Sequence, residues 1–273
     1  MTRAATLIVG RGKVGRALAT ALRASGLSVR LVAGRTVTPA VVASARTVVL
    51  ALPDAALAAA ADRLAAGLGR GTVVLHCAGR LGVEPLAACR RSGARVGVMH
   101  PLVSFPSSRV APPLVGATFV VTGDSRAVQV ARDLSRRVGA RALVTPVHGA
   151  AYHAAAAMLA GGAVALVSHS TDVLVALGVH RPAARRALAG LLASVASNLS
   201  RLDAPDALTG PVARGDADAV AAHRAALLAQ SPEALALYDA LAPAVLEIAV
   251  RAGLDTKRAR AVRRALRMRL PSH

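Results

Sequence analysis

The chain has 273 residues, a length that suits one large domain or two modest ones, and 54% of them are apolar. With no Trp, two Phe and two Tyr, its core has to be built mainly from Ala, Val and Leu. Two cysteines are too few for a disulfide framework and favour a reducing compartment, and the N-terminus lacks a signal-peptide pattern. We therefore expect a cytoplasmic protein.

The formal net charge of +20 comes almost wholly from arginine. Most arginines are scattered, but one dense basic group lies near the C-terminus: Lys257, Arg258, Arg260, Arg263, Arg264, Arg267 and Arg269. No aromatic side chains alternate with this group, so it offers no stacking platform for bases. We interpret it as a solvated helix face and expect no nucleic-acid partner, with a basic nucleic-acid binder as an alternative.

The first 146 residues alternate short β-branched runs with stretches rich in Ala, Leu and Arg. The runs predict seven strands: Thr6–Val9, Ser28–Val32, Thr47–Leu52, Thr72–Leu75, Arg95–Met99, Thr118–Val121 and Ala142–Thr145. Continuous apolar runs are typical of parallel strands covered by helices on both faces. Val14–Ala24 and Ala55–Ala66 are long enough for crossover helices. Residues 1–146 are therefore predicted to form a Rossmann-like α/β domain with a doubly wound parallel sheet.

A glycine motif, Gly-Arg-Gly-Lys-Val-Gly, follows the first predicted strand and opens the first helix. The first glycine allows a tight turn, the second lets a pyrophosphate approach the backbone, and the third lets the helix pack on the sheet. The helix N-terminus would present free N–H groups to the phosphates. We therefore predict that a dinucleotide contacts Gly10, Arg11, Gly12, Lys13, Val14 and Gly15.

The ends of the next strands predict which dinucleotide binds. An NAD site has an acid after the second strand, whereas this chain has Arg35 and Thr36, which could hold the 2′-phosphate of NADP. Leu52 and Pro53 would form the loop over the cofactor, and Asp54 would cap the helix that follows. Cys77, after the fourth strand, is counted with the cofactor-binding residues, with a thiol that mainly packs.

Three histidines are candidate site residues. His76 and His100 end predicted strands at the carboxyl edge of the sheet, where ligands bind in such folds. His153 begins the long helix of the second half. We predict His100 and His153 as catalytic groups that orient or protonate a substrate in a crevice between the two halves, while for His76 a site role and a loop-tying role stay open. No spacing predicts a metal site.

From residue 147 to the end the pattern is helical. Helices are predicted at Ala150–Ala176, Pro182–Leu202, Asp216–Ala229, Pro232–Ala252 and Thr256–Arg269. The most apolar stretch, Ala154–Val167, is too short for a membrane span, so we expect a buried helix and no membrane partner. Asp216 is a predicted helix cap, and Arg214 could either bind an anionic group or be a surface residue.

In these residues the chain resembles a two-domain family, with a Rossmann-like NADP-binding half and a C-terminal helical domain of unknown function, that is akin to pyrroline-5-carboxylate reductase and to the F420-dependent NADP oxidoreductases. The matching pieces are Gly10–Gly15, Pro53-Asp54, His76–Gly79, His100–Phe105, Tyr152–Ala155, and Leu208–Asp216 with His223. Two positions depart from the family pattern, Ala78 in place of Ser and Gly161 in place of Asn. The resemblance implies oxidoreductase chemistry and a helical half, residues 147–273, that binds substrate and forms a homodimer.

The function predicted from these features is an NADP-dependent oxidoreductase that transfers a hydride to or from a small carbonyl, imine or hydroxy compound. The alternative is a non-catalytic sensor or scaffold that binds NADP(H) without turnover.

Overall fold

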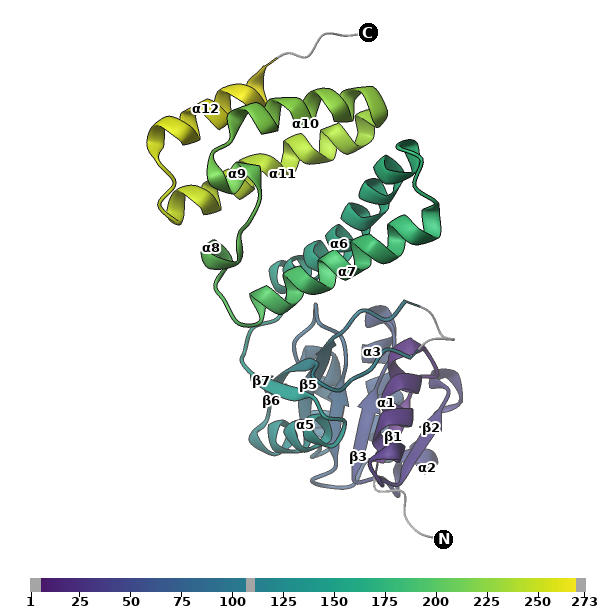
Figure 1. Cartoon of the computed structure of the whole chain (residues 1–273). Coiled ribbons are helices and arrows are strands. Elements are labelled where there is room, and N and C mark those ends of the chain that lie inside the picture. Colours follow the sequence, from purple (N-terminus) through teal and green to yellow (C-terminus); the bar gives the residue numbers. More distant parts are fainter. Residues whose placement is uncertain (1–5, 107–110, 269–273) are drawn as a thin grey trace. The chain divides into compact units, whose positions relative to one another are not determined.

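The computed structural model describes residues 6–106 and 111–268 (Figure 1). The chain divides into two compact units, Met1–Ala160 and Gly161–His273. The border between them lies inside a single helix, α6 (Ala150–Ala176). Each unit is therefore described by itself.

The first unit is built around a seven-stranded sheet with the strand order β2-β1-β3-β4-β5-β6-β7. Its strands are β1 (Thr6–Val9), β2 (Val29–Val32), β3 (Thr47–Leu50), β4 (Val73–His76), β5 (Arg95–Leu102), β6 (Thr118–Gly123) and β7 (Arg141–Val144). The first five are mutually parallel, which confirms the predicted α/β class. The sheet is not wholly parallel, however, because β6 pairs with β5 in the antiparallel sense. The described part of the β5–β6 connection contains no crossover helix, which a parallel return would require.

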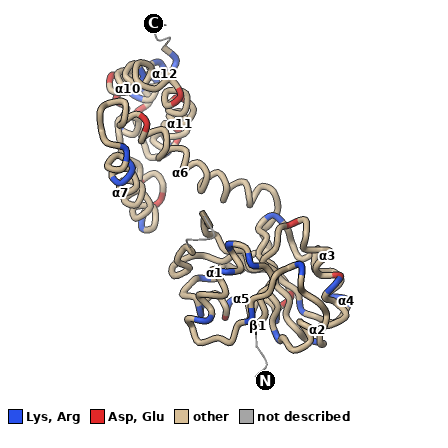
Figure 2. The backbone as a smooth tube through the Cα atoms, turned by 90° about the vertical axis from the view of Figure 1, so that its right-hand side faces the viewer, with Lys and Arg blue, Asp and Glu red and all other residues tan. Residues whose placement is uncertain are grey.

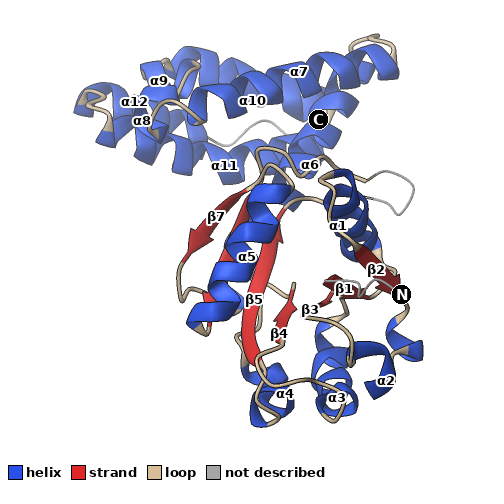
Figure 3. Cartoon of the chain, turned by 90° about the horizontal axis from the view of Figure 1, so that it is seen from below, coloured by secondary structure: helices blue, strands red, loops and turns tan. Residues whose placement is uncertain are grey.

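Helices cover both faces of this sheet (Figure 3). On one face pack α1 (Lys13–Ala24) and α5 (Ser125–Arg137), with Leu18, Leu22 and Leu134 in the core. On the other face pack α2 (Pro39–Val42), α3 (Asp54–Ala65) and α4 (Ala87–Arg91), with Leu57 and Leu64 in the core. Two short 3-10 helices, η1 (Gly34–Thr36) and η2 (Glu84–Leu86), lie in the connections.

The register of the parallel strands brings the predicted site loops to one edge. Val9 lies opposite both Val32 and Leu50, and Leu50 lies opposite His76. The residues that follow these four positions therefore meet at the carboxyl edge of the sheet.

The second unit is helical in its described part, as predicted. It holds the C-terminal part of α6 together with α7 (Arg181–Leu199), α8 (Ala204–Ala207), α9 (Pro211–Arg214), α10 (Ala217–Gln230), α11 (Pro232–Arg251) and α12 (Thr256–Arg267). Val212, Val220, Leu246 and Val262 form its core. Asp216 caps α10 as predicted, because its carboxylate accepts from the Ala219 N–H at 3.0 Å.

One ion pair, between a buried arginine and a partly exposed aspartate, joins the last three long helices. The guanidinium of Arg224 on α10 donates to both carboxylate oxygens of Asp239 on α11, at 2.8 and 3.0 Å. It also donates to the carbonyl oxygens of Ala265 and Met268, each at 2.8 Å. A single side chain thus ties α10, α11 and the end of α12 together.

The C-terminal basic group lies mainly on α12 (Figure 2). Ala259, Val262 and Ala265 face the core, while the lysine and the arginines of the helix are exposed. The group is therefore a solvated helix face, as predicted, apart from Arg269, which lies outside the described residues.

Helix α6 differs from its prediction. Of its 27 residues only Thr171 is buried, so the expected buried helix is wrong for the isolated chain. The helix is also longer than the predicted apolar stretch and, by length and composition alone, could cross a membrane. Core helices of soluble proteins can have the same length and composition. The exposed apolar face of α6 therefore needs to be covered either by protein or by lipid.

Candidate functional site

The glycine motif forms the turn between β1 and α1. Gly10 has φ +119°, a conformation that favours glycine, and a side chain there would overlap the carbonyl oxygen of Ala51. A side chain at Gly15 would overlap the carbonyl oxygen of Gly10. Gly12 differs, because no protein atom lies within 4 Å of the position that a Cβ would take. The loop itself thus needs Gly10 and Gly15, while the space beside Gly12 is open.

Gly12 is the N-cap of α1, and its side of the helix faces outward. The first hydrogen bond of the helix runs from the Arg16 N–H to the Gly12 carbonyl at 3.0 Å, so the N–H groups of the first turn have no partner within the helix. Together with the helix dipole they favour an anion. The Lys13 ammonium donates to the carbonyl oxygen of Pro106 at 3.0 Å.

A cavity of about 410 Å³ opens beside this loop. It is lined by residues from the ends of three parallel strands and from α3: Gly10, Arg11, Gly12, Gly34, Arg35, Ala51, Leu52, Pro53, Ala56 and Arg63. Six of the predicted cofactor-binding residues are among them. Lys13, Val14, Gly15, Thr36 and Cys77, which were also predicted, do not line it.

Three guanidinium groups from three elements line this cavity, and no carboxylate does. Arg11 comes from the glycine loop, Arg35 from η1 and Arg63 from α3. Arg35 is exposed and forms no ion pair with any described residue. Sequence reasoning missed Arg63, although it stands two helical turns after Ala56, on the same face of α3. The cavity is thus suited to a phosphate group.

Thr36, Leu52 and Asp54 have local roles. The Thr36 hydroxyl donates to the Ala33 carbonyl at 3.1 Å, and the Leu52 side chain lies against Gly34, where a Cβ would come within 2.6 Å of it. Asp54 is the first residue of α3 rather than its cap, since Pro53 takes the cap position. The Asp54 carboxylate instead accepts from Arg80 at 3.2 Å, so its predicted capping role is wrong.

His76 has both ring nitrogens occupied inside the protein. Its Nε2 lies 2.6 Å from the Gly82 carbonyl, and its Nδ1 accepts from the Ala78 N–H at 3.1 Å. Because Nδ1 is an acceptor, the proton resides on Nε2 and is donated to Gly82. Burial lowers the pKa of the ring. For His76 a site role and a loop-tying role were left open, and these contacts support the loop-tying role.

His100 forms a hydrogen-bonded pair with Tyr152. The His100 Nδ1 and the Tyr152 hydroxyl oxygen are 2.7 Å apart, and the rings meet edge to face with centroids 5.6 Å apart. The ring also lies against the backbone of Gly79, where a Cβ would come within 2.6–2.8 Å of three ring atoms. Tyr152 stands at the start of α6, in the first unit, and was not among the predicted catalytic residues.

The pKa values in this pair favour neutral side chains. Burial, helped by the charge of His153, lowers the pKa of His100 to about 4, so the ring is neutral near pH 7. Burial raises the pKa of the Tyr152 hydroxyl, which therefore keeps its proton. Of the two roles predicted for His100, to orient or to protonate a substrate, a neutral imidazole bonded to a phenol favours the first.

Three further predicted residues form no hydrogen bond with this pair within the described residues. His153 is exposed on α6 and shares no hydrogen bond with His100 within the described residues. Cys77 packs against the core on one face of the sheet, and burial raises the pKa of its thiol to about 12, which makes it a poor nucleophile. Arg214 is exposed at the end of α9. No cluster of His, Cys, Asp and Glu in the described ranges could hold a metal ion.

Comparisons with known proteins agree with this architecture. Residues 117–245 match the family model of a domain of unknown function, DUF2520, from β6 of the sheet into α11. A search of the curated proteins finds no match in sequence.

Three solved structures are similar over nearly the whole chain. A protein from Thermotoga maritima is 24% identical with a TM-score of 0.66, covering 90% of this chain and 98% of its own. The pyrroline carboxylate reductase of Plasmodium falciparum, with NADP bound, is 12% identical with a TM-score of 0.62, covering 96% and 99%. The reductive aminase of Aspergillus terreus, with NADPH and ethyl levulinate, is 21% identical with a TM-score of 0.64, covering 96% and 99%. The predicted resemblance is thus confirmed in the fold, a Rossmann-like sheet followed by a helical region.

Proposed function

We propose that the chain is an NADP(H)-dependent oxidoreductase that reduces or oxidises a small carbonyl, imine or hydroxy compound. The observation that carries the proposal is the cavity at the carboxyl edge of β1, β2 and β3, where three arginines and an open helix N-terminus meet. The fold is shared with proteins whose structures contain NADP or NADPH. A dinucleotide with an extra phosphate fits this charge better than one without it.

Different residues of the cavity bind different parts of the cofactor. The first turn of α1 and the open side of Gly12 hold the pyrophosphate, because free N–H groups and a positive dipole favour an anion there. Arg35 holds the 2′-phosphate, as its guanidinium matches the phosphate oxygens in a two-point contact. Arg11 and Arg63 add positive charge from the other two walls of the cavity.

The proton is handled by Tyr152 and His100. When bound, the cofactor supplies or accepts a hydride, and reduction of a C=O or C=N group also needs a proton on the oxygen or nitrogen. The Tyr152 hydroxyl keeps its proton and gives it to that atom, while the neutral ring of His100 orients the hydroxyl through their 2.7 Å hydrogen bond. Tyr152 then regains a proton from water. His153, exposed nearby on α6, stays a predicted second contact to the substrate.

Cofactor titration tests the proposal. The unmodified protein should bind NADPH more tightly than NADH, and Arg35→Asp should weaken NADPH binding by roughly 10- to 100-fold, the size of a lost charge-assisted contact, while sparing NADH. Gly12→Val should abolish binding of both cofactors with an unchanged circular dichroism spectrum, because the side chain fills the pyrophosphate space. Arg70→Asp, an exposed arginine outside the cavity, is the matched control. Equal affinity of the unmodified protein for the two cofactors would contradict the proposal.

A second candidate is a sensor that binds NADP(H) without turnover. The observation in its favour is that His76, His100 and Tyr152 already form hydrogen bonds with partners inside the protein. A screen of imines and 2-oxo acids with NADPH separates the candidates. Tight NADPH binding with no turnover on any member of the panel would favour the sensor.

A further inference from the structure

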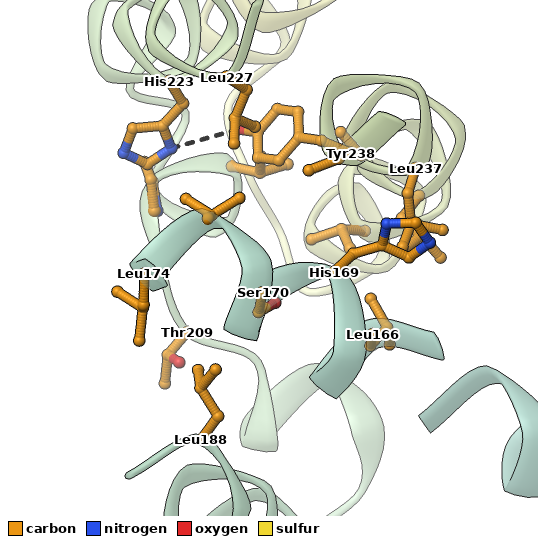
Figure 4. A pocket seen from close by; sticks show the side chains of 17 residues that line it. Leu166, His169, Ser170, Leu174, Leu188, Thr209, His223, Leu227, Leu237 and Tyr238 are labelled. Atoms are coloured by element: carbon orange, nitrogen blue, oxygen red, sulfur yellow. Dashed lines mark hydrogen bonds between the residues drawn. The ribbon is translucent and has the colours of Figure 1, made fainter. Parts of the chain in front are cut away.

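A second cavity lies wholly inside the helical unit (Figure 4). Its volume is about 460 Å³, and its walls come from α6, α7, α9, α10 and α11 and the residues just before α9. This size falls within the range of pockets that hold small organic ligands. Every lining residue belongs to Gly161–His273, so the cavity shares no lining residue with the one beside the glycine loop of the first unit.

Most of the wall is aliphatic. Leucines from four helices provide much of it, among them Leu174, Leu188, Leu227 and Leu237. Leu166 and Leu241 are partly exposed, at 40% and 38%, so the cavity is open to solvent on their side. The chain as a whole has a net charge of +20, yet no Lys, Arg, Asp or Glu lines this cavity. A charged ligand would lose its hydration here without gaining an opposite fixed charge.

Polar side chains interrupt the aliphatic wall at a few points. His223 and Tyr238 stand together, with the Tyr238 hydroxyl oxygen 3.4 Å from His223 Nδ1 and the rings edge to face at 6.0 Å (Figure 4). His169 and Ser170 of α6 and Thr209 also line the cavity. The bond between Tyr238 and His223 is long, so the hydroxyl can turn to a ligand acceptor at little cost.

We propose that this cavity is a binding site for a small uncharged compound with an aliphatic body and one hydrogen-bonding head group, such as a ketone or an alcohol. The aliphatic wall takes the body, and the Tyr238 hydroxyl donates to the oxygen of the head group. Binding here does not depend on the proposed redox activity.

Methyl ketones from butanone to octanone are the probes. Their binding to the full chain is measured at pH 8 by the shifts of the histidine ring protons in NMR spectra. Each added CH₂ should tighten binding about fourfold until the cavity is full. Hexanoate should bind at least tenfold more weakly than hexanone, because its carboxylate finds no fixed cation in the wall.

Three variants locate the site. Ser170→Leu fills the cavity and should abolish hexanone binding, whereas Ser168→Leu, on the same helix but outside this cavity, should not change it. Tyr238→Phe should weaken hexanone binding about fivefold, as expected for the loss of one hydrogen bond. Circular dichroism of each variant shows whether the fold is kept, and NADPH titration of the same samples reports on the nucleotide site independently.

Three outcomes would overturn the proposal. One is that no ketone binds to the folded, unmodified protein. Another is that Ser170→Leu and Ser168→Leu affect binding equally. The third is that the chain forms a dimer that excludes the ketones, which would assign the cavity to an interface between two copies.

Discussion

The surroundings of His100 favour one of the two protonation states that its position in the sequence left open. A histidine at the carboxyl edge of a sheet is a candidate proton donor because its ordinary pKa is close to 7. Here burial and the charge of His153 lower that pKa to about 4. Such surroundings are assembled from distant parts of the chain, so sequence spacing could not reveal them.

The first prediction concerns this pKa. In an NMR titration the ring protons of His100 should show no transition between pH 8 and pH 5 and should titrate only near pH 4. Protonation of this histidine also makes the stability of the fold depend on pH. Between about pH 6.5 and 4 the unfolded chain binds a proton at this histidine that the folded chain does not, so this group makes the fold less stable as the pH falls through that window. A transition of His100 near pH 6.5 would contradict the assignment.

The second prediction concerns the pair that His100 forms. Once a substrate is known, Tyr152→Phe and His100→Ala should each lower turnover by roughly 100-fold, the scale of a lost general acid, with NADPH affinity unchanged. His153→Ala tests the predicted second histidine, and His180→Ala, exposed between α6 and α7, is the control. If Tyr152→Phe keeps full activity and loses only thermal stability, the pair has a structural role alone.

The third prediction concerns His76. In His76→Ala the Gly82 carbonyl and the Ala78 N–H lose their partners in a buried place, so the free energy of unfolding should fall by about 3 kcal/mol. Urea unfolding followed by circular dichroism measures this change. His148→Ala removes an exposed histidine for comparison, and an equal midpoint for both variants would refute the loop-tying role.

The residues that line the cavity beside the glycine loop were the part of the candidate site best predicted from sequence. Gly10, Gly12 and Arg35 could be identified because the turn, the helix start and the strand end are all local in sequence. Arg63 and Tyr152 were not assigned to the site, because their contributions depend on contacts with elements far away in the chain, although Arg63 shares a helix face with Ala56 and Tyr152 lies in a segment that matches the family.

At the scale of elements, periodicity located most helices and strands to within a few residues. Long apolar runs separated by turn residues are strong local signals, and β1 and α6 were predicted with the same bounds as observed. The direction of β6 was predicted wrongly as parallel, since an apolar run has the same pattern in either direction. The exposure of α6 was missed for a similar reason: composition shows that a helix needs a cover, but not whether its own chain supplies it.

The fourth prediction tests the ion pair that joins α10, α11 and α12. Arg224→Met leaves Asp239 and two carbonyl groups without their donor, and the free energy of unfolding of the helical unit should fall by about 3 kcal/mol. Arg181→Met breaks the exposed pair with Asp172, where both side chains are largely in water, and should cost less than about 1 kcal/mol. Hydrogen exchange of α10 and α12 would localise the change. Equal effects of the two variants would show that Arg224 does not tie the helices together.

For the whole molecule, the exposed apolar helices raise the question of what covers them. On α7, Leu191, Leu192, Val195 and Leu199 recur at helical spacing and are each more than 40% exposed. On α6, Met158, Leu159 and Val164 are exposed by 69% or more. Exposed apolar stretches of this kind mark interfaces with protein or lipid.

The fifth prediction is that a second copy of the chain covers these faces in a homodimer. Light scattering in detergent-free buffer should give twice the chain mass at micromolar concentration, and the double variant Leu191→Glu with Val195→Lys should give a monomer. A monomer mass for the unmodified chain would contradict the dimer. Recovery of the chain only with membranes would mean that lipid covers α6 and would also contradict the predicted cytoplasmic location.

The scarcity of aromatic residues gives this protein an unusual intrinsic fluorescence. It contains no Trp, and its two tyrosines lie one in each unit: Tyr152 beside His100 and Tyr238 beside the cavity of the helical unit. All tyrosine emission of the chain therefore originates at the two candidate sites. In Tyr238→Phe the remaining tyrosine emission reports only on the first unit, and in Tyr152→Phe only on the second. A bound reduced nicotinamide that quenches the first signal and a ketone that shifts the second could thus be followed in one unlabelled protein.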